Sequence, residues 1–403
     1  MPDGAAPAAR PAASAAVTMM PPGLPPPLVC MLSAAHPPAD VRVVGKEGAT
    51  LVSAGWRVRH ICPAAAGAVG GEARHGVAIA PYRRAAGWLG RLRNIPALAR
   101  RAADSGAAVL HASEPDAWLA AILAARRNGA RVVLDVHEHY PSRLDHRLPR
   151  LLRPLLAPLA RAAIRGACRA MARRADAVVV AKDGLDGDFA APERIVPVRN
   201  YARASQVTPR RHRAGPLTLV HLGALGRARG AMEMLDCLAF CPASTRLTLV
   251  GRFTDGSESA FAGRAERLEL AARVTRRGWL PHGEALAEAA RCDIGLVLFQ
   301  PGVENHRLAL PHKLFDCMLA GLPVIAPAFA TEVAQVVREA ECGLLVDTAD
   351  PEAIAAAVRR LADPGLRAGM GARGREAALG RFGWAGEAER LVRLYHRLAP
   401  LPR

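Results

Sequence analysis

The stretch PHKLFDCMLAGLPVIAP, residues 311–327, shows how this chain alternates helix and strand. Lys313 and Asp316 precede a helix-like segment, and Gly321 and Pro323 then lead directly into an apolar strand. A glycine that ends a helix and a proline before the next strand are ordinary signals of a helix-to-strand connection. These signals explain Gly321 and Pro323 but neither Lys313 nor Asp316.

The same alternation continues in both directions from this stretch. From Leu28 onward, short apolar runs alternate with amphipathic stretches rich in Ala, Leu and Arg, the pattern of parallel sheets covered by helices. The first half contains the runs VCMLS, VRHICP, AAVLHAS, RVVLDVHE and DAVVVA. A second series contains LTLVHLGAL, RLTLVGRF, VTRRGWL, IGLVLF, LPVIAP and GLLVD. The sequence therefore predicts an α/β fold with two Rossmann-like, doubly wound domains.

The length of 403 residues is consistent with two domains. Residues 1–27 are rich in Ala and Pro and hold almost no large apolar side chains, so we expect a disordered tail. We expect an N-terminal domain over residues 28–206, and the polar, Pro-bounded segment 207–216 is typical of a linker. A C-terminal domain is expected over residues 217–380. Residues 381–403 are expected to form a final helix, for which packing against the N-terminal domain is one arrangement.

Composition indicates a globular protein of the cytoplasm. Hydrophobic residues make up 51% of the chain, and it shows neither a secretory leader nor about 18 consecutive apolar residues. The eight cysteines are scattered, without CxxC pairs or neighbouring histidines at zinc-ligand spacing. We therefore expect buried free thiols in a reducing compartment and no metal site.

The net charge of +18 calls for an anionic partner, although part of it reflects a general use of Arg. A basic nucleic-acid-binding protein is one alternative, but aromatic residues are only 4% of the chain, which leaves little for base stacking. We expect no specific nucleic acid partner. A Rossmann enzyme that modifies sugar nucleotides is a second alternative. It needs GxGxxG after the first strand, where MLSAAHPP has no glycine.

Ligands of doubly wound sheets bind outside the carboxyl ends of the strands. The strand in LDVHEHYPS, residues 134–142, ends in His137 and Glu138, and such a polar cluster is costly to bury without a function. Asp116 and Asn200 follow two further strands, and Asn200 is expected to mark the crossover between domains. Both are equally well explained as caps of helices or turns.

Two segments of the second half are suited to a phosphorylated ligand. In HLGALGRARG, residues 221–230, Arg227 and Arg229 follow Gly223 in a loop that opens a helix, where amides and guanidinium converge on an anion. The alternative is that these glycines only bend the chain. Lys313 would stabilise a diphosphate, and the carboxylate of Asp316 would accept the two hydroxyls of a ribose, unless it only favours the helix dipole.

Residues 311–327 resemble the donor-binding motif of glycosyltransferase family 4, in which a Glu, a small residue and Met precede Ala-x-Gly-x-Pro-Val. The resemblance extends over nearly the whole chain after the tail, and it implies the GT-B fold, with two domains facing across a cleft. It also implies that Asp316 contacts the nucleotide ribose. The acid here is one methylene shorter, and the family's earlier Glu falls on Leu308. Glu304 and Asn305 are candidate substitutes for that Glu.

Three other segments carry the same resemblance. HLGALGRARG resembles the opening of the family's C-terminal domain, which implies that Arg229, or Arg227, binds donor phosphate. LDVHEHYPS resembles Asp-x-His-Glu-x-Tyr-Pro, which implies that His137 contacts the transferred sugar and that Glu138 orients it or contacts the acceptor.

The third segment, residues 36–58, resembles a subgroup's Asp-x-Arg-Val-x-Lys-Glu-Ala. It places Asp40 and Arg42 on the cleft, where with Asp116 they form the expected acceptor side. A local ion pair at a solvated helix start is the alternative for Asp40 and Arg42.

The implied reaction moves a sugar from a nucleoside diphosphate sugar to a hydroxyl acceptor with retention at the anomeric carbon. The expected role is in cell-surface polysaccharide or glycolipid synthesis. No Asp-x-Asp motif is present, so protein cations are expected to neutralise the leaving diphosphate, without metal or cofactor. The donor base, the sugar and the acceptor are not identified by the sequence.

Residues 148–175 raise the question of a membrane contact. Pro149, Pro154 and Pro158 interrupt the first half, so a single long helix is not expected. A domain helix with a solvated Arg face is one interpretation. The other is peripheral binding at the inner face of the cell membrane, near a lipid-linked acceptor. The side chains proposed to meet lipid are Leu151, Leu152, Leu155, Leu156, Arg150, Arg153 and Arg161.

Overall fold

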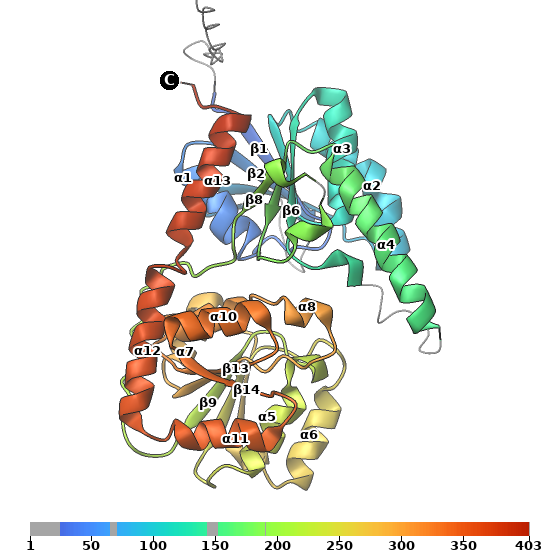
Figure 1. The fold of residues 1–403 in the computed structure, drawn as a ribbon. Helices are drawn as coiled ribbons and strands as arrows, with labels where there is room; N and C mark the ends of the chain where they lie inside the picture. The colour runs from blue at the N-terminus through green and yellow to red at the C-terminus, as the bar shows by residue number, and fades with distance from the viewer. Residues whose placement is uncertain (1–24, 65–70, 143–151, 190, 403) are drawn as a thin grey trace, which may run out of the picture.

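The computed structural model describes residues 25–64, 71–142, 152–189 and 191–402 (Figure 1). All but the last three residues of the expected tail, 1–27, lie outside these ranges. Within them the chain forms two α/β units, each built on one sheet. This confirms the predicted fold class.

The first sheet has eight strands in the order β3-β4-β2-β1-β5-β6-β7-β8, with β3 antiparallel to β4 and the other pairs parallel. The strands are β1 (Leu28–Leu32), β2 (Arg57–Pro63), β3 (Ala73–Arg74), β4 (Val77–Tyr82), β5 (Val109–Ala112), β6 (Arg131–Val136), β7 (Ala177–Val180) and β8 (Ile195–Pro197). Its helices are α1 (Ala49–Ser53), preceded by a π-helical turn at Val43–Gly48, then α2 (Gly87–Ala103), α3 (Pro115–Asn128) and α4 (Arg153–Ala172).

Every residue of β1, β5 and β7 is buried, as expected for parallel strands covered by helices on both faces. The five strands predicted for this half are present. The predicted set lacks β3 and β4, because β3 is very short and Pro81 interrupts the apolar run of β4. The short strand β8 is the one that Asn200 was expected to follow.

The second sheet has six strands, all parallel, in the order β11-β10-β9-β12-β13-β14. They are β9 (Thr218–Leu222), β10 (Arg246–Val250), β11 (Val274–Gly278), β12 (Ile294–Leu296), β13 (Val324–Pro327) and β14 (Gly343–Val346). All six were predicted. The helices are α5 (Ala231–Ala239), α6 (Glu258–Arg267), α7 (His282–Ala289), α8 (Glu304–Arg307), α9 (His312–Leu319), α10 (Thr331–Ala340), α11 (Pro351–Arg360), α12 (Pro364–Leu379) and α13 (Trp384–Leu398).

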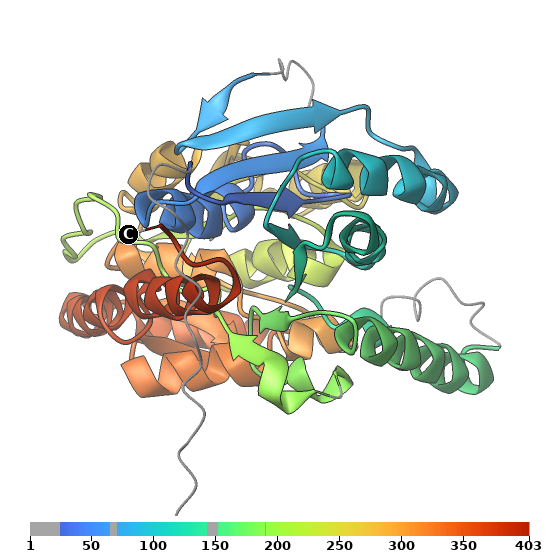
Figure 2. The same cartoon turned by 90° about the horizontal axis from the view of Figure 1, so that it is seen from above.

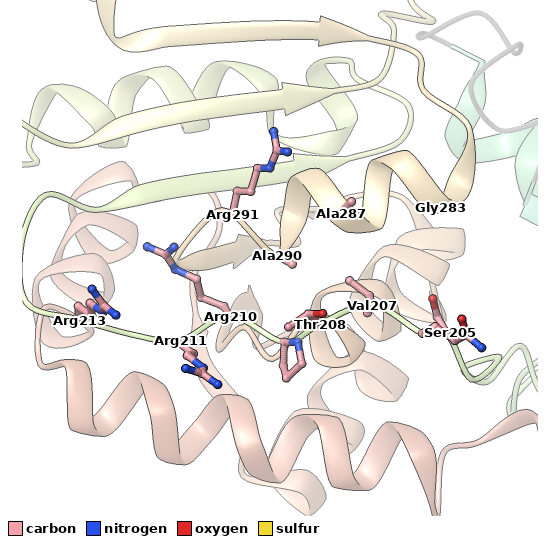
Figure 3. Close-up of a pocket in the computed structure, with 12 residues that line it drawn as sticks. Ser205, Val207, Thr208, Arg210, Arg211, Arg213, Gly283, Ala287, Ala290 and Arg291 are labelled. Carbon is pink, nitrogen blue, oxygen red and sulfur yellow. The ribbon is translucent and has the colours of Figure 1, made fainter.

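Two segments connect the halves. Residues 203–217 run without helix or strand along the second half. Figure 3 shows residues 205–211 and Arg213 beside α7, where they line a cavity of about 740 Å³. After α12 the chain returns to the first half as α13 (Figures 1 and 2). Trp384, Leu391 and Tyr395 of α13 are buried in one cluster with residues of β1, β6 and β7.

Two details differ from the sequence analysis. α9 begins at His312, so Lys313 and Asp316 lie inside the helix rather than before it. α4 is a single helix of 20 residues. Pro154 is in its first turn, where its missing N–H would have no partner, and Pro158 removes only one further hydrogen bond.

All eight cysteines are free and buried, which confirms that prediction. None of the described helices is both long and apolar enough to span a bilayer.

Candidate functional site

A cavity of about 500 Å³ lies between the carboxyl ends of the two sheets. The first half contributes residues that directly follow β1, β6, β7 and β8, and the second half contributes those that follow β9 and β12 and the first turns of α9. A neighbouring cavity of about 520 Å³ shares Asp40, His312 and Asp316 with it. We refer to the first of these cavities as the cleft.

The structure brings most of the predicted site residues together. Those that line the cleft are Asp40, Arg42, His137, Glu138, Gly223, Arg229, Asn305, Lys313 and Asp316. Asn200, expected at the crossover, lines it as well. Arg227, Glu304 and Asp116 do not.

The second half holds two of these three exceptions. Arg227 is exposed, and its backbone N–H donates to Asp255 at 2.7 Å, so Arg229 alone of the two arginines lines the cleft. Glu304 forms an ion pair with Arg307 at 2.6 Å and lines a separate cavity. Asn305 is therefore the candidate substitute that lines the cleft, where its Oδ1 accepts from Lys182 at 3.1 Å.

Asp116 was expected on the acceptor side of the cleft. It lies in the first turn of α3, where both carboxylate oxygens accept from Arg91 at 2.7 Å. It lines a different and largely apolar cavity between α2, α3 and α4. An acid in the first turn also favours the helix dipole, so the capping alternative accounts for its position.

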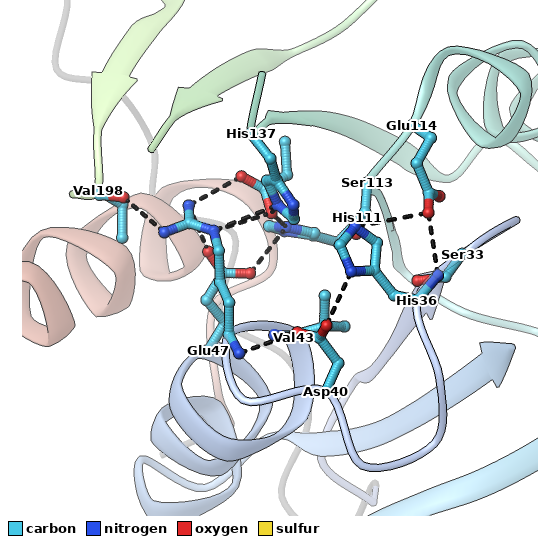
Figure 4. A network of polar contacts seen from close by, with 12 residues as sticks. Ser33, His36, Asp40, Val43, Glu47, His111, Ser113, Glu114, His137 and Val198 are labelled. Carbon is cyan, nitrogen blue, oxygen red and sulfur yellow. Dashed lines mark hydrogen bonds and ion pairs between the residues drawn. The ribbon is translucent and has the colours of Figure 1, made fainter. Parts of the chain in front are cut away.

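His137 is held by a buried ion-pair network (Figure 4). Its Nε2 contacts the carboxylate of Asp135 and lies 3.2 Å from Nε of Arg42, and the Arg42 guanidinium lies 2.9 Å from Asp135 Oδ1. Burial opposes ionisation of Asp135, but Arg42 and His137 outweigh it and hold the pKa of Asp135 well below its usual range. Arg42 also donates to the carbonyl of Val198 at 3.0 Å. Arg42 is thus buried and orients His137. The alternative of a solvated helix start does not fit this position.

A second layer lies behind this network. Nδ1 of His111 is 2.7 Å from the hydroxyl of Tyr395 on α13, and its Nε2 is 3.3 Å from Glu47. Burial lowers the pKa of His111, but Asp135 and Glu47 reverse the effect and raise it to about 9. Glu47, His111 and Asp135 lie close enough to hold a metal ion. However, the Arg42 guanidinium lies 2.8 Å from Glu47 and supplies positive charge there.

The loop after β1 is shaped by Glu114. The Glu114 carboxylate accepts the backbone N–H groups of Ala34, Ala35 and His36 at 2.8 to 3.1 Å. Nδ1 of His36 lies 2.8 Å from Asp40, and its ring is 4.8 Å from that of His137, edge to face. Burial works against the charge of His36, but Asp40 outweighs it and raises the pKa of His36 to about 9.

On the opposite side of the cleft, two cations lie without an acidic partner. Arg229 and Lys313 approach the ring of Phe299 to 5.9 and 5.8 Å. Among the described residues, no carboxylate lies within ion-pair distance of either side chain. Burial lowers the pKa of both, and for Lys313 the neighbouring Arg229 adds to the effect. This pair is therefore suited to an anion that enters the cleft.

The backbone at this position leaves room for such an anion. Gly223 has a φ of 87°, a conformation that glycine adopts without strain, and a Cβ there would lie 4.0 Å from Cε of Lys313. Gly230 has a φ of 81°, and a Cβ on it would lie only 2.2 Å from the carbonyl of Leu298. Both positions thus favour glycine, Gly230 also through its close approach to Leu298, and the alternative that these glycines bend the chain is consistent with both.

Asp316 lies on α9 between the two neighbouring cavities. Its Oδ1 is 2.9 Å from Nε2 of His282 at the start of α7, and this contact raises the pKa of His282. Among the described residues, no group donates a hydrogen bond to the other oxygen, Oδ2, and the side chain is 14% exposed. The carboxylate can therefore accept further hydrogen bonds from a ligand.

Lys46 joins the two halves beside the cleft. Its Nζ lies 3.2 Å from Oδ1 of Asn200 and 3.2 Å from Nδ1 of His312, and it approaches the ring of Trp384 on α13 to 5.6 Å. Burial lowers the pKa of Lys46 to about 7.

Sequence reasoning missed His36, Lys46, Lys182, His282 and His312. His36 and Lys182 follow the ends of β1 and β7, so the strand-end signal that indicated His137 applies to them too. Lys46, His282 and His312 depend on contacts between the halves or between separate helices, which no local pattern encodes.

Comparisons with known proteins agree with this architecture. Residues 41–200 match the family described as Glycosyltransferase Family 4, and residues 216–363 match Glycosyl transferases group 1. A D-inositol 3-phosphate glycosyltransferase from Acidothermus cellulolyticus is 38% identical over 93 residues, which are 23% of this chain and only 20% of the relative.

Solved structures share the whole fold. A sucrose-phosphate synthase from Thermosynechococcus elongatus superimposes with a TM-score of 0.76 at 17% identity, over 93% of this chain and 99% of that chain. HepE from Anabaena in complex with UDP-glucose gives a TM-score of 0.69 at 16% identity, over 92% and 100% of the two chains.

Two doubly wound domains that place the cleft between the ends of their strands define the GT-B fold. Both halves of the chain match models of glycosyltransferase families, and the chain has the GT-B fold.

Proposed function

We propose that this protein is a retaining glycosyltransferase that transfers a sugar from a UDP-sugar to a hydroxyl acceptor, without a metal ion or cofactor. The proposed role is in cell-surface polysaccharide or glycolipid synthesis. One observation carries the proposal: Lys313 is buried and Arg229 is half-buried beside Gly223, across the cleft from His137, and no carboxylate of the described residues forms an ion pair with either side chain. UDP is the proposed nucleotide because the similar HepE structures contain UDP and UDP-glucose.

In the proposed reaction, the bond between the anomeric carbon and the diphosphate breaks, and its electron pair leaves with the diphosphate. The acceptor oxygen bonds to the same carbon, and its proton passes to the departing diphosphate, which has gained the electron pair. Negative charge grows on the diphosphate as the bond breaks, so cations that lie beside it stabilise the transition state more than the substrate. Arg229 and Lys313 are the proposed cations, and they perform the neutralisation that a metal ion performs in other enzymes.

The remaining roles follow from position in the cleft. Asp316 is proposed to accept the ribose hydroxyls, and His137, which Asp135 and Arg42 hold in place, is proposed to contact the sugar. Glu138, Asp40 and His36 lie on the same side of the cleft as His137 and are proposed to face the acceptor. Retention at the anomeric carbon rests on the family resemblance.

We also propose that the protein works in the cytoplasm and binds the membrane peripherally through the amino-terminal end of α4. There Leu155 is 69% exposed, and α4 contains no acidic residue. Arg153 and Arg161 would meet anionic headgroups, at about 1 kcal/mol each, whereas Arg150 and Leu151 lie outside the described residues.

Co-sedimentation with phosphatidylglycerol vesicles tests the membrane contact. Binding should fall with salt and drop in the double variant Arg153→Gln, Arg161→Gln. Equal recovery with phosphatidylcholine and phosphatidylglycerol vesicles would leave α4 as an ordinary domain helix.

A thermal-shift panel of UDP-, GDP- and ADP-sugars, run with and without EDTA, tests the donor. A ligand at 100 times its Kd stabilises the folded state by about 2.7 kcal/mol. A UDP-sugar should raise the Tm equally in both buffers. A shift with GDP- or ADP-sugars alone would reassign the nucleotide, and a shift lost in EDTA would contradict metal independence.

A further inference from the structure

A large apolar cavity lies in the first half, apart from the cleft. Its volume is about 1360 Å³, and α2, α3 and α4, which lie side by side on one face of the sheet, form most of its wall (Figure 1). Its apolar lining includes Leu92, Ile95, Leu119, Ile164 and Met171.

The inner end of this cavity lies behind the acceptor side of the cleft. Ala34 and Ala35 line the cavity, and the next residue, His36, lines the cleft. Tyr140 lines the cavity, three residues after His137, and its hydroxyl donates to the carbonyl of Ser113 at 3.2 Å. The loops after β1 and β6 thus separate the two cavities. In each loop, one residue lines the cleft and another lines the apolar cavity.

The surface around the cavity is apolar as well. Apart from Val41, all exposed large apolar side chains among the described residues of the first half belong to α2, to α3 or to α4 and its N-cap. Leu152, Leu155 and Leu159 are spaced three and four residues apart and therefore lie on one side of α4. The full set is Leu89, Leu92, Leu119, Leu152, Leu155 and Leu159.

Positive charge surrounds this apolar surface. Neither α2 nor α4 contains an acidic residue, and Arg84 and Arg91 line the cavity itself. Asp116 neutralises Arg91 at 2.7 Å. An apolar surface with a basic rim is suited to a bilayer whose headgroups are anionic, and less so to a second copy of this chain, whose net charge is +18.

We propose that this cavity binds the hydrocarbon chain of a membrane lipid that carries the acceptor hydroxyl. The chain would lie between α2, α3 and α4, and the headgroup would pass the loops of Ala35 and Tyr140 to reach the cleft. This inference rests on the proposed function, because it supplies the acceptor class for the same reaction.

The test is a calorimetric titration with butyl, hexyl and octyl phosphate as monomers. The headgroup is constant, so any change in Kd reports the chain alone. Because each buried methylene contributes a constant free energy, the wild-type Kd should tighten about 3- to 4-fold for each added methylene.

Two variants of α4 locate the binding. Ala167 is exposed and lines the cavity, whereas Ala162 is exposed on the same helix and does not line it. Ala167→Trp fills the cavity and should abolish the dependence on chain length, and Ala162→Trp should keep it. A Kd that does not change with chain length, or equal dependence in both variants, would overturn the proposal. A dimer that dissociates on Ala167→Trp would also overturn it, because the occupant would then be a second copy.

A titration with UDP-glucose separates this inference from the proposed function. Ala167→Trp should leave the donor Kd within about 2-fold of wild type, since the cavity does not include the donor residues. A wild-type protein that binds octyl phosphate with the expected dependence but no nucleotide sugar would contradict the proposed function and keep the cavity as a lipid site.

Discussion

Nζ of Lys313 lies 2.8 Å from Nε2 of His221, inside the wall of the cleft. Burial holds the pKa of each group well below its usual range; Lys313 adds to this effect on His221, and Arg229 adds to it on Lys313. The contact therefore joins two nitrogen bases. An anion that enters the cleft would favour their protonated forms.

We expect UDP to bind with uptake of a proton at this pair, because a diphosphate beside Lys313 raises its pKa. Calorimetric titration of UDP at pH 7.5, in two buffers of different ionisation enthalpy, measures the uptake. The apparent enthalpy should depend on the buffer for the wild type and not for Lys313→Met. The matched control is Lys46→Met, which removes the other buried lysine near Asp316 and should keep the dependence. Loss of the dependence in the control instead would assign the proton to Lys46.

Asp316→Ala should weaken UDP-glucose binding by about 1–3 kcal/mol, because charge-assisted hydrogen bonds to the ribose are lost. Calorimetry gives the affinity, and the Tm shows whether the fold persists. Asp236→Ala is a matched control, since Asp236 is a partly buried carboxylate paired with Arg264 on another part of the domain. An Asp316→Ala protein with wild-type affinity would remove the residue from the donor site.

His137→Ala should retain UDP binding and lose about 10²-fold or more in kcat, if the imidazole contacts the sugar in the transition state. Steady-state turnover with UDP-glucose measures the effect. His396→Ala changes an exposed histidine of α13 and should leave turnover unchanged. Normal turnover in His137→Ala would make the residue structural.

Lys46 should make stability depend on pH. Its pKa falls from 10.5 to about 7 on folding, so the unfolded state binds more protons between these values. Stability from this group is thus fully present above pH 10.5 and is lost as the pH falls through 7, with a slope of up to about 1.4 kcal/mol per pH unit. His36 and His111, whose pKa values rise from 6.5 to about 9, act in the opposite direction.

The difference in the free energy of unfolding between wild type and Lys46→Met therefore isolates the effect of the lysine. We measure the free energy of unfolding of both proteins in urea at pH 7 and pH 9. The value for the variant minus that for wild type should be larger at pH 7 than at pH 9. An equal difference at both values would contradict the lowered pKa.

The sequence predicted the sheets well because parallel strands buried on both faces appear as continuous apolar runs. It missed β4, where Pro81 interrupts such a run. Strand ends also located His137 and Asn200, since the carboxyl ends of the strands converge on the cleft. Asp116 follows a strand as well, but it lies in another cavity, because a strand end does not show which way the first turn of the next helix faces.

Other site residues depend on long-range contacts. Asp135 follows an apolar run and looks like part of the strand, yet Arg42, 93 residues away, makes it the support of His137. Glu304 and Asn305 are adjacent in sequence and equivalent as candidates, and only the position of α8 separates them. The subgroup indicated by Asp40 and Arg42 stays a prediction.

A crystal structure of the protein with UDP-glucose tests the central claim most directly. We expect the diphosphate between Arg229 and Lys313, the ribose hydroxyls within hydrogen-bond distance of Asp316, and the glucose ring toward His137. A nucleotide bound elsewhere, or a diphosphate in contact with neither cation, would contradict it.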